Sequence, residues 1–185
     1  MATKIVIVGG VAGGASAAAR ARRVDEHAEI ILLERDEYVS FANCGLPYYI
    51  GGEIKERDDL LVATVEMLTS RFNIDIRTFS EVVKIDRSSK QVEIKKRDSG
   101  ETYMESYDKL LLAPGAAPIK PPLDGIDLNT IFTVRNIPDT DKIKAYVDTQ
   151  SPRSAVVVGG GFIGLEMAEQ LVHRGVSTCA KRAWP

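Results

Sequence analysis

Short aliphatic runs alternate with longer amphipathic segments along this chain. The runs Lys4 to Val8 and Glu29 to Leu33 are almost continuously apolar, which is typical of strands buried on both faces of a parallel sheet. The segment between them, Ala15 to Val24, is rich in Ala and Arg and predicts a helix. Together they form a strand–helix–strand unit of about 30 residues, the length expected of a nucleotide-binding fold.

A β-meander is predicted further along the chain, because short strand patterns there are separated by turn residues. Its strands are expected over Glu81 to Asp86, Gln91 to Lys96 and Tyr103 to Tyr107. The other predicted elements are a loop-like segment over Ser40 to Gly52, a mainly helical segment over Asp58 to Phe72, a strand over Lys109 to Ala113 and a helix over Asp139 to Thr149.

A second strand–glycine–helix unit begins at Ser154 to Val158. Its Ala-Val-Val-Val-Gly-Gly repeats the Ile-Val-Ile-Val-Gly-Gly near the start, so two nucleotide sites are predicted in one chain. The predicted fold is α/β: a Rossmann-like three-layer fold with a parallel sheet and an inserted β-meander. Residues 1–150 are expected to form the first nucleotide-binding domain, and residues 151–185 to begin a second one.

The second unit is predicted to be incomplete. A full unit needs a buried strand that ends in an acidic or basic selector about 20 residues beyond the last glycine. Val176 opens such a strand, but the residues after it are not expected to continue it. We therefore expect the chain to be a fragment or a prematurely terminated product.

Small residues at the two glycine turns have a physical reason. The first glycine permits the tight turn, the second lets the backbone approach a pyrophosphate, and the third lets the helix pack on the strand. The second turn satisfies the pattern with Gly159, Gly161 and Gly164, whereas the first has Gly9 and Gly14 with Val11 in the middle position. The alternative is a doubly wound sheet whose glycines serve packing alone.

Composition narrows the class of protein. There are 24 Lys and Arg against 26 Asp and Glu, so the chain lacks the excess of positive charge that a nucleic-acid-binding protein needs. No window approaches the roughly 18 apolar residues that a membrane span needs. Two widely spaced cysteines cannot build a disulfide framework, which favours a reducing compartment and a cytoplasmic protein. No metal site is predicted.

Cys44 lies in Ser-Phe-Ala-Asn-Cys-Gly-Leu-Pro-Tyr (40–48), shortly after the second strand. This places it at the carboxyl-end crevice of the sheet, where a cofactor ring would lie. A redox cysteine reacts as the thiolate; the alternative is a buried, inert cysteine.

Four motifs occur in order: residues 8–17, 40–48, 110–116 and 158–166. With them the sequence resembles the single-cysteine branch of the flavin-dependent pyridine nucleotide–disulfide oxidoreductases, specifically the coenzyme A disulfide and persulfide reductases. The resemblance extends to about Val176.

The resemblance implies two cofactors, FAD and either NADH or NADPH. Its implied FAD contacts are the first turn (Gly9, Val11, Ala12, Gly13 and Gly14), Glu34 on the adenosine ribose with Arg35 beside it, the turn Ala113, Pro114 and Gly115, and Arg135. The turn Gly159, Gly161 and Gly164 is implied to hold the pyrophosphate of NADH or NADPH. The position of Glu34, 20 residues beyond Gly14, independently suits a ribose contact.

The implied substrate is coenzyme A disulfide or persulfide. Cys44 is implied to cycle between a thiol and a mixed disulfide, with Asn43 and Ser40 lining the thiol site. Ser16, Arg20 and Arg23 match positions that contact coenzyme A. Independently of the family, the spacing i, i+4, i+7 places these three on one helix face, where guanidiniums suit a phosphate. The alternative is a solvated charged face.

The implied activity is the reduction of a disulfide or persulfide by NAD(P)H through FAD and Cys44, in a homodimer of the full-length relative. The isolated chain is expected to bind FAD poorly and to turn over negligibly, because the family's later FAD segment and dimerisation domain are expected to be missing. Three alternatives stay open: an NADH oxidase or peroxidase with a cysteine sulfenic acid, an inactive or regulatory nucleotide-binding module, and a dithiol enzyme, which is disfavoured because no second Cys lies near Cys44.

Overall fold

The computed structural model describes residues 2–181, and the chain divides into two compact units. The first unit comprises the residues up to Phe41 together with Leu61–Ala116, and the second comprises Ala42–Leu60 together with the chain from Ala117 onward. Each unit has a hydrophobic core of its own. The predicted domain boundary at residue 150 divides the chain differently and stays a prediction.

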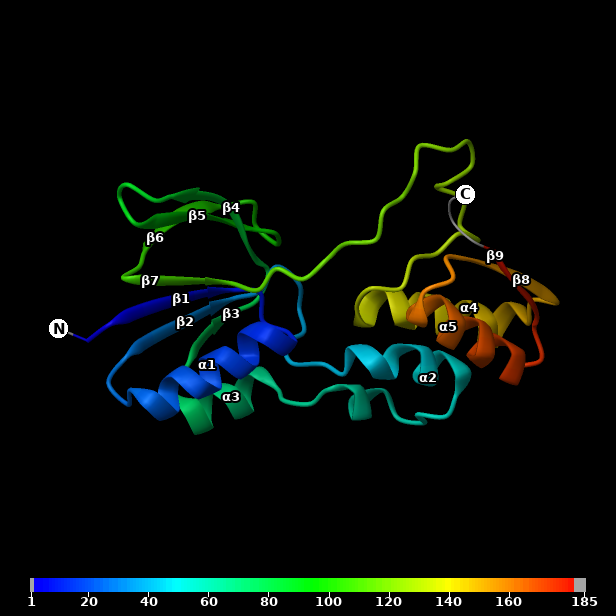
Figure 1. Cartoon of the computed structure of the whole chain (residues 1–185), viewed down its shortest axis with the longest axis horizontal. Coiled ribbons are helices and arrows are strands. Elements are labelled where there is room, and N and C mark those ends of the chain that lie inside the picture. The colour runs from blue at the N-terminus through cyan, green and yellow to red at the C-terminus, as the bar shows by residue number, and fades with distance from the viewer. Residues whose placement is uncertain (1, 182–185) are drawn as a thin grey trace. The chain divides into compact units, whose positions relative to one another are not determined.

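A four-stranded parallel sheet organises the first unit (Figure 1). Its strands lie in the order β3 (Asp75–Arg77), β2 (Glu29–Leu33), β1 (Lys4–Val8) and β7 (Lys109–Leu112). The predicted bounds of β1 and β2 are confirmed to the residue. The short β3 was not predicted.

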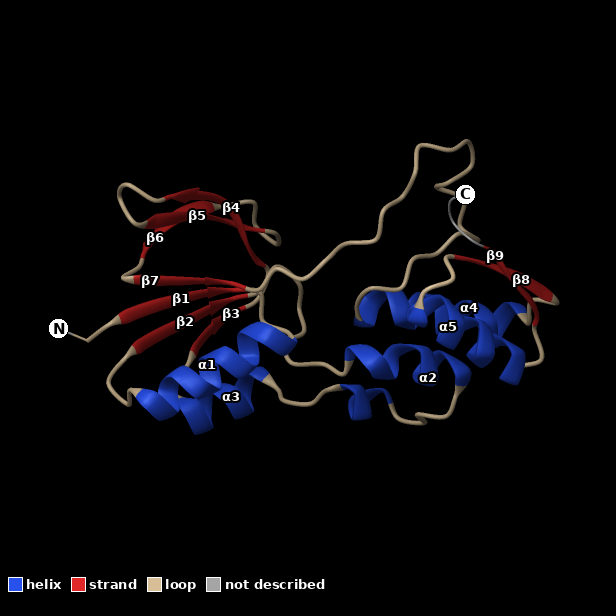
Figure 2. Ribbon diagram, viewed as in Figure 1, coloured by secondary structure: helices blue, strands red, loops and turns tan. Residues whose placement is uncertain are grey.

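Two layers cover this sheet, one on each face (Figure 2). Helices α1 (Ala12–Val24) and α3 (Val65–Phe72) lie on one face, and the antiparallel meander β4–β5–β6 lies on the other. The meander strands are β4 (Ser80–Asp86), β5 (Gln91–Lys96) and β6 (Thr102–Ser106). The predicted three-layer α/β fold is confirmed.

Alternation along the central strands explains why both faces are covered. In β1, Ile7 faces the helices and belongs to the cluster with Ala18 of α1, whereas Val6 belongs to the cluster with Val92 and Ile94 of the meander. The side chains of Val6 and Ile7 are both fully buried. A strand that is apolar at successive positions needs such cover on both sides.

The second unit is built from helices on a two-stranded parallel sheet. Its elements are η1 (Asn43–Gly45), α2 (Leu46–Gly51), η2 (Arg57–Leu60), α4 (Ile137–Gln150), β8 (Ser154–Val158), α5 (Phe162–His173) and β9 (Ser177–Lys181). Its core joins Ile50 of α2, Val147 of α4 and Leu171 of α5, with Val157 of β8 packed against them.

Two expectations about the second unit were wrong. The segment over Ser40 to Gly52 contains helix α2, because Pro47 occupies a first-turn position that tolerates proline and Gly52, at φ +84°, ends the helix in the left-handed conformation. The chain beyond Val176 does form a strand, β9, because parallel pairing with β8 stabilises a segment whose own sequence pattern is weak.

The segment predicted as mainly helical from Asp58 begins as η2, and α3 itself starts at Val65.

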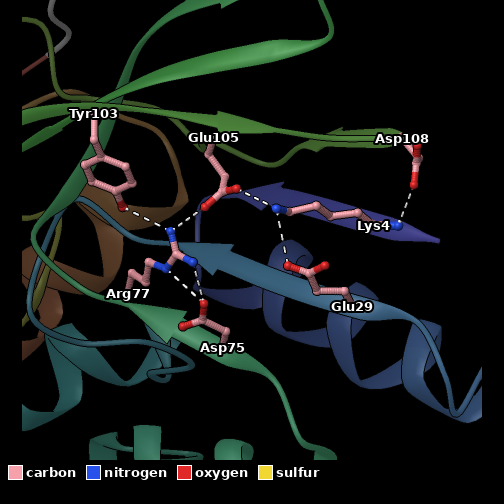
Figure 3. A network of polar contacts seen from close by, with 7 residues as sticks. All are labelled: Lys4, Glu29, Asp75, Arg77, Tyr103, Glu105 and Asp108. Atoms are coloured by element: carbon pink, nitrogen blue, oxygen red, sulfur yellow. Dashed lines mark hydrogen bonds and ion pairs between the residues drawn. The ribbon is translucent and has the colours of Figure 1, made fainter. Parts of the chain in front are cut away.

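A polar network joins the strands of the first unit across the layers (Figure 3). Glu105 of β6 binds Lys4 of β1 at 2.6 Å and Arg77 of β3 at 2.6 Å, and Arg77 also binds Asp75 at 2.6 Å. Burial raises the pKa of Glu105, but the hydrogen bonds from Lys4 and Arg77 outweigh it, so the pKa lies below its usual value. The network therefore ties the meander to the sheet.

Between residues 2 and 181, none of the helices combines the length and the apolar character that crossing a membrane requires.

Candidate cofactor and thiol sites

The first glycine turn connects β1 to α1 and is closed by two tight backbone contacts. Gly9 has φ +95°, and a β-carbon there would lie 2.1 Å from the carbonyl oxygen of Ala113. A β-carbon at Gly14 would lie 1.7 Å from the carbonyl oxygen of Gly9. Only glycine fits either position, so the start of α1 packs directly on the turn, as a dinucleotide-binding turn requires.

The start of α1 suits an anion. Val11 is the N-cap and provides no side-chain hydrogen bond, while Ala12 and Gly13 of the first turn are exposed. A first-turn N–H lacks a partner within its helix and is favourable to phosphate. With Val11 in the position of the middle glycine, the first-turn residues Ala12 and Gly13 therefore remain exposed to a ligand.

Glu34 is fixed beside this turn. Its side chain is buried, Oε2 accepts the N–H of Gly10 at 2.7 Å, and Oε1 accepts the N–H of Asp36 at 3.0 Å. Each carboxylate oxygen has a further lone pair, so the group still has capacity to accept ribose hydroxyls. Arg35, the next residue, is half-buried.

Ser40 and the turn at Ala113 lie against the same glycines. The N–H of Ser40 donates to the Gly10 carbonyl at 3.0 Å, and Ser40 has the unusual φ of +47°. Ala113 donates its N–H to Val8 at 2.8 Å, and its β-carbon would be 3.4 Å from one placed on Gly13. Pro114 and Gly115 follow and are exposed. The first unit therefore brings together a group of residues that the resemblance assigns to FAD, and their geometry fits a dinucleotide.

The second glycine turn repeats the geometry of the first. Gly159 has φ +121°, Gly161 is the N-cap of α5, and a β-carbon at Gly164 would lie 1.9 Å from the Gly159 carbonyl oxygen. The N–H of Gly159 donates to Lys181 at 2.8 Å, just as that of Gly9 donates to Leu33 at 2.8 Å. By this repeat the equivalent of Glu34 is residue 182, which lies outside the described residues.

Cys44 is exposed in η1, immediately before α2, and Asn43 beside it is also exposed. The alternative of a cysteine buried in apolar packing is therefore excluded. One turn later, the pKa of the Tyr48 hydroxyl is raised, first by the charge of Glu166, then by burial and by further acidic groups that include Cys44. Cys44 and Asn43 belong to the second unit, as does Arg135, which is half-buried just before α4.

The predicted basic face of α1 is exposed at Ser16, Arg20 and Arg23. Sequence reasoning missed its extension onto α3. The guanidinium carbon of Arg23 lies 5.5 Å from the ring centre of Phe72, and that of Arg71 lies 5.6 Å from the same centre. The Arg-Phe pair in α3 was the available signal, but the pattern of α3 indicated only a helix.

Arg22 differs from its neighbours because it caps helices. Its guanidinium donates to four backbone carbonyls, those of Asp25 and Glu26 after α1 and those of Phe72 and Asn73 at the end of α3. Arg22 is thus structural. Across residues 2–181, no three His, Cys, Asp or Glu side chains gather as a group that could hold a metal ion.

A family model described as pyridine nucleotide-disulphide oxidoreductase matches residues 3–180. The chain belongs to this family. Its enzymes use FAD with NADH or NADPH, so the cofactors predicted from the sequence are those of the family.

Curated relatives define the branch. A coenzyme A disulfide reductase of Staphylococcus haemolyticus is 43% identical over 173 residues, which cover 94% of this chain and 39% of the relative. A second, from Staphylococcus epidermidis, is 42% identical over 177 residues with the same coverage. The predicted resemblance to the coenzyme A disulfide reductase branch is confirmed, and the chain spans about two fifths of the length of these relatives.

The comparison with solved structures agrees with this family assignment. Reduced Bacillus anthracis CoADR-RHD superposes with a TM-score of 0.94 at 58% identity and covers 98% of this chain, which corresponds to 33% of that protein. A NAD-dependent persulfide reductase from A. fulgidus gives 0.90 at 38% identity, covering 96% of this chain and 33% of that one. A water-forming NADH oxidase from Lactobacillus brevis gives 0.89 at 27% identity, covering 98% of this chain and 40% of that one.

Proposed function

We propose that this chain provides the FAD-binding turn, the redox cysteine and the start of the pyridine nucleotide site of a coenzyme A disulfide or persulfide reductase. The observation that carries the proposal is the exposed Cys44 in a chain whose first glycine turn has the backbone geometry of a dinucleotide site. The names of the relatives, coenzyme A disulfide reductase and persulfide reductase, support this substrate class.

In this proposal the first unit holds FAD. The N–H groups at the start of α1 bind the pyrophosphate, and Glu34 accepts the ribose hydroxyls. FAD, when bound, supplies the two-electron chemistry that returns the cysteine to its thiolate form. The second turn, Gly159 to Gly164, holds the pyrophosphate of NADH or NADPH.

Cys44 performs the thiol chemistry. Its thiolate attacks one sulfur of coenzyme A disulfide, which forms a mixed disulfide on Cys44 and releases the other half as coenzyme A thiolate. With coenzyme A persulfide as substrate, the thiolate attacks the sulfane sulfur instead, which forms a persulfide on Cys44, breaks the S–S bond of the substrate and releases coenzyme A thiolate. Asn43, next to Cys44 in the same unit, lines the thiol site, and Ser40 is assigned to it by the family resemblance alone.

The basic face of α1 binds the nucleotide portion of coenzyme A. Arg20 and Arg23 donate to its phosphates, and Ser16 adds a hydroxyl on the same face. Arg71 supports this role because it lies on the same Phe72 ring as Arg23.

Formation of the mixed disulfide tests the proposal without requiring turnover. The chain carrying Cys179→Ser is incubated with coenzyme A disulfide and with a small uncharged disulfide, and the adduct on Cys44 is followed by mass spectrometry. We expect Arg20→Ala with Arg23→Ala to slow the first reaction about tenfold or more, because each charged hydrogen bond is worth about 1.5–3 kcal/mol, and to leave the second unchanged.

Arg87→Ala is the matched control, since Arg87 is exposed in the turn between β4 and β5. The meander that contains this turn covers the face of the sheet opposite α1 (Figure 1). A Cys44 that forms no adduct with coenzyme A disulfide, or an adduct whose rate is indifferent to the α1 arginines but falls with Arg87→Ala, would contradict the proposal.

An NADH oxidase is the second candidate, favoured by the likeness to the water-forming enzyme of Lactobacillus brevis. In that case Cys44 cycles through a sulfenic acid. Peroxide treatment followed by a sulfenic-acid probe distinguishes the two: a stable, high-yield Cys44 sulfenic acid without reaction toward coenzyme A disulfide favours the oxidase.

A further inference from the structure

The segment that carries Cys44 belongs to the same compact unit as the second glycine turn. Residues 42–60 lie between β2 and α3 in sequence, yet they pack with the chain beyond residue 117. Arg57 binds Asp141 of α4 at 2.9 Å, and the ammonium of Lys144 lies 5.2 Å from the ring centre of Tyr49. Contacts from the later chain therefore hold the cysteine segment in place.

The tightest of these contacts joins α2 to α5. A β-carbon on Gly51 would lie 1.7 Å from Oε1 of Gln170 and 2.9 Å from its Cβ, so the Gln170 side chain fills the space that a larger residue would need. Its Nε2 donates to Glu53 at 2.8 Å. The guanidinium of Arg174, the C-cap of α5, donates to the Ile50 carbonyl at 3.2 Å. The last turn of α2, at Ile50, and the chain just after the helix, at Glu53, are thus both held by α5 and its C-cap.

Gln170 is an unusual residue for packing alone. Its side chain is fully buried, and Oε1 has no hydrogen-bond partner among residues 2–181. Leaving a buried acceptor unsatisfied costs free energy that an apolar side chain of similar volume would avoid. The amide does provide a donor that holds Glu53 immediately after the left-handed Gly52, where the chain leaves α2.

The two ends of α5 then have different tasks. Its N-terminus follows Gly161 of the second glycine turn, and Gln170 lies on the same rigid helix about 9 Å further along, at 1.5 Å per residue from Gly164. Whatever fixes α2 to Gln170 also fixes Cys44 relative to this turn, because Cys44 lies in η1, the short helix directly before α2.

We propose that Gln170 is a positioning residue for Cys44: by filling the space over Gly51 and binding Glu53, it makes the cysteine segment and the second glycine turn one rigid body. The catalytic purpose of this positioning rests on the redox role proposed for Cys44. The existence of the rigid body does not depend on that role.

A distance measurement tests the proposal on the full chain. With Cys179→Ser removing the other thiol, nitroxide labels on Cys44 and on Val172→Cys, an exposed position of α5, report the distance between them by double electron–electron resonance. We expect one narrow distribution. Gln170→Ala, which removes the filler and the donor, and Gly51→Ala, which displaces Gln170, should each broaden it roughly twofold or more, because α2 then opens locally.

Val176→Ala is the matched control. Val176 is buried in the core of the same unit but is not part of the Gly51–Gln170–Glu53 contact. It should lower the stability of the unit and leave the distribution narrow. A broad distribution in the parent chain, no broadening in Gln170→Ala, or equal broadening in Val176→Ala would each overturn the proposal.

The labels read out position, not chemistry, so this result is independent of the redox proposal. A narrow distribution that depends on Gln170, with no coenzyme A adduct on Cys44, would leave the rigid body intact and remove its catalytic purpose. The opposite pair of results would retain the thiol chemistry and remove Gln170 from it.

Discussion

Two adjacent glycines of α1 should respond in opposite directions to the same substitution. A β-carbon at Gly14 would lie 1.7 Å from the Gly9 oxygen, and real β-carbons essentially never approach closer than 3.0 Å, so α1 must move by more than about 1 Å. The nearest atom to a β-carbon at Gly13 is 3.4 Å away, an ordinary contact. Gly13→Ala therefore keeps the helix in place, whereas Gly14→Ala cannot.

The magnitudes follow from helix propensity and overpacking. Alanine is favoured over glycine inside a helix by about 1 kcal/mol, so Gly13→Ala should raise the free energy of unfolding by up to that amount. Gly14→Ala has the same gain but an overpacking cost of about 1–3 kcal/mol or more. The helix gain is common to both variants, so the difference between them equals the overpacking cost. Because the clash is between backbone and backbone, we expect the upper end of that range, a separation of about 3 kcal/mol or more.

Urea unfolding without cofactor, followed by far-ultraviolet circular dichroism, measures both values. The second turn repeats the steric part of the test, since a β-carbon at Gly164 would lie 1.9 Å from the Gly159 oxygen, whereas one at Gly160, outside α5, meets no atom within 4 Å and brings no helix gain. Equal stability of Gly14→Ala and Gly13→Ala would show that the turn yields easily and would refute the steric reasoning.

Three further substitutions test the scaffold. Glu105→Gln should lower stability by about 1–3 kcal/mol at neutral pH. Because the pKa of Glu105 is depressed, the difference from the parent should begin to shrink as the pH falls below the usual value of 4.5 and vanish only below the depressed pKa, as pH-dependent unfolding would show. Arg22→Ala should cost about 2 kcal/mol by loss of its carbonyl contacts, whereas Arg20→Ala should be neutral in the same thermal unfolding. Thr64→Ala should cost about 1 kcal/mol and expose the N–H of Met67 to hydrogen exchange, because Thr64 caps α3.

Sequence patterns predicted the elements that carry strong periodicity. The strands Lys4–Val8, Gln91–Lys96 and Ser154–Val158 have the predicted bounds because β-branched runs and flanking turns mark both ends. β3 escaped prediction because Asp75–Arg77 is short and charged, and only its pairing with β2 makes it a strand. β9 was missed for the same reason, since its partner β8 supplies the order that its own sequence lacks.

The candidate site divides in the same way. The roles of Gly9 and Gly14 follow from spacing, because the turn is local and each steric contact involves near neighbours or the next strand of the sheet. The environment of Cys44 could not be predicted, since the segment around it is ordered by residues far along the chain. The hydrogen bond from Gln170 to Glu53 spans 117 positions.

The Gly51-Gly52 pair shows why one residue type can conceal two causes. Gly52 is required by its own backbone, at φ +84°, and its role as the end of a helix belongs to local turn chemistry. Gly51 has helical backbone, and alanine there would favour the helix, so its reason lies entirely in the Gln170 side chain that occupies the space beside it. A glycine pair in a sequence predicts a turn. Only the packed structure shows that Gly51 leaves space for a side chain of another helix, Gln170 of α5. In our proposal the position of Cys44 depends on that side chain.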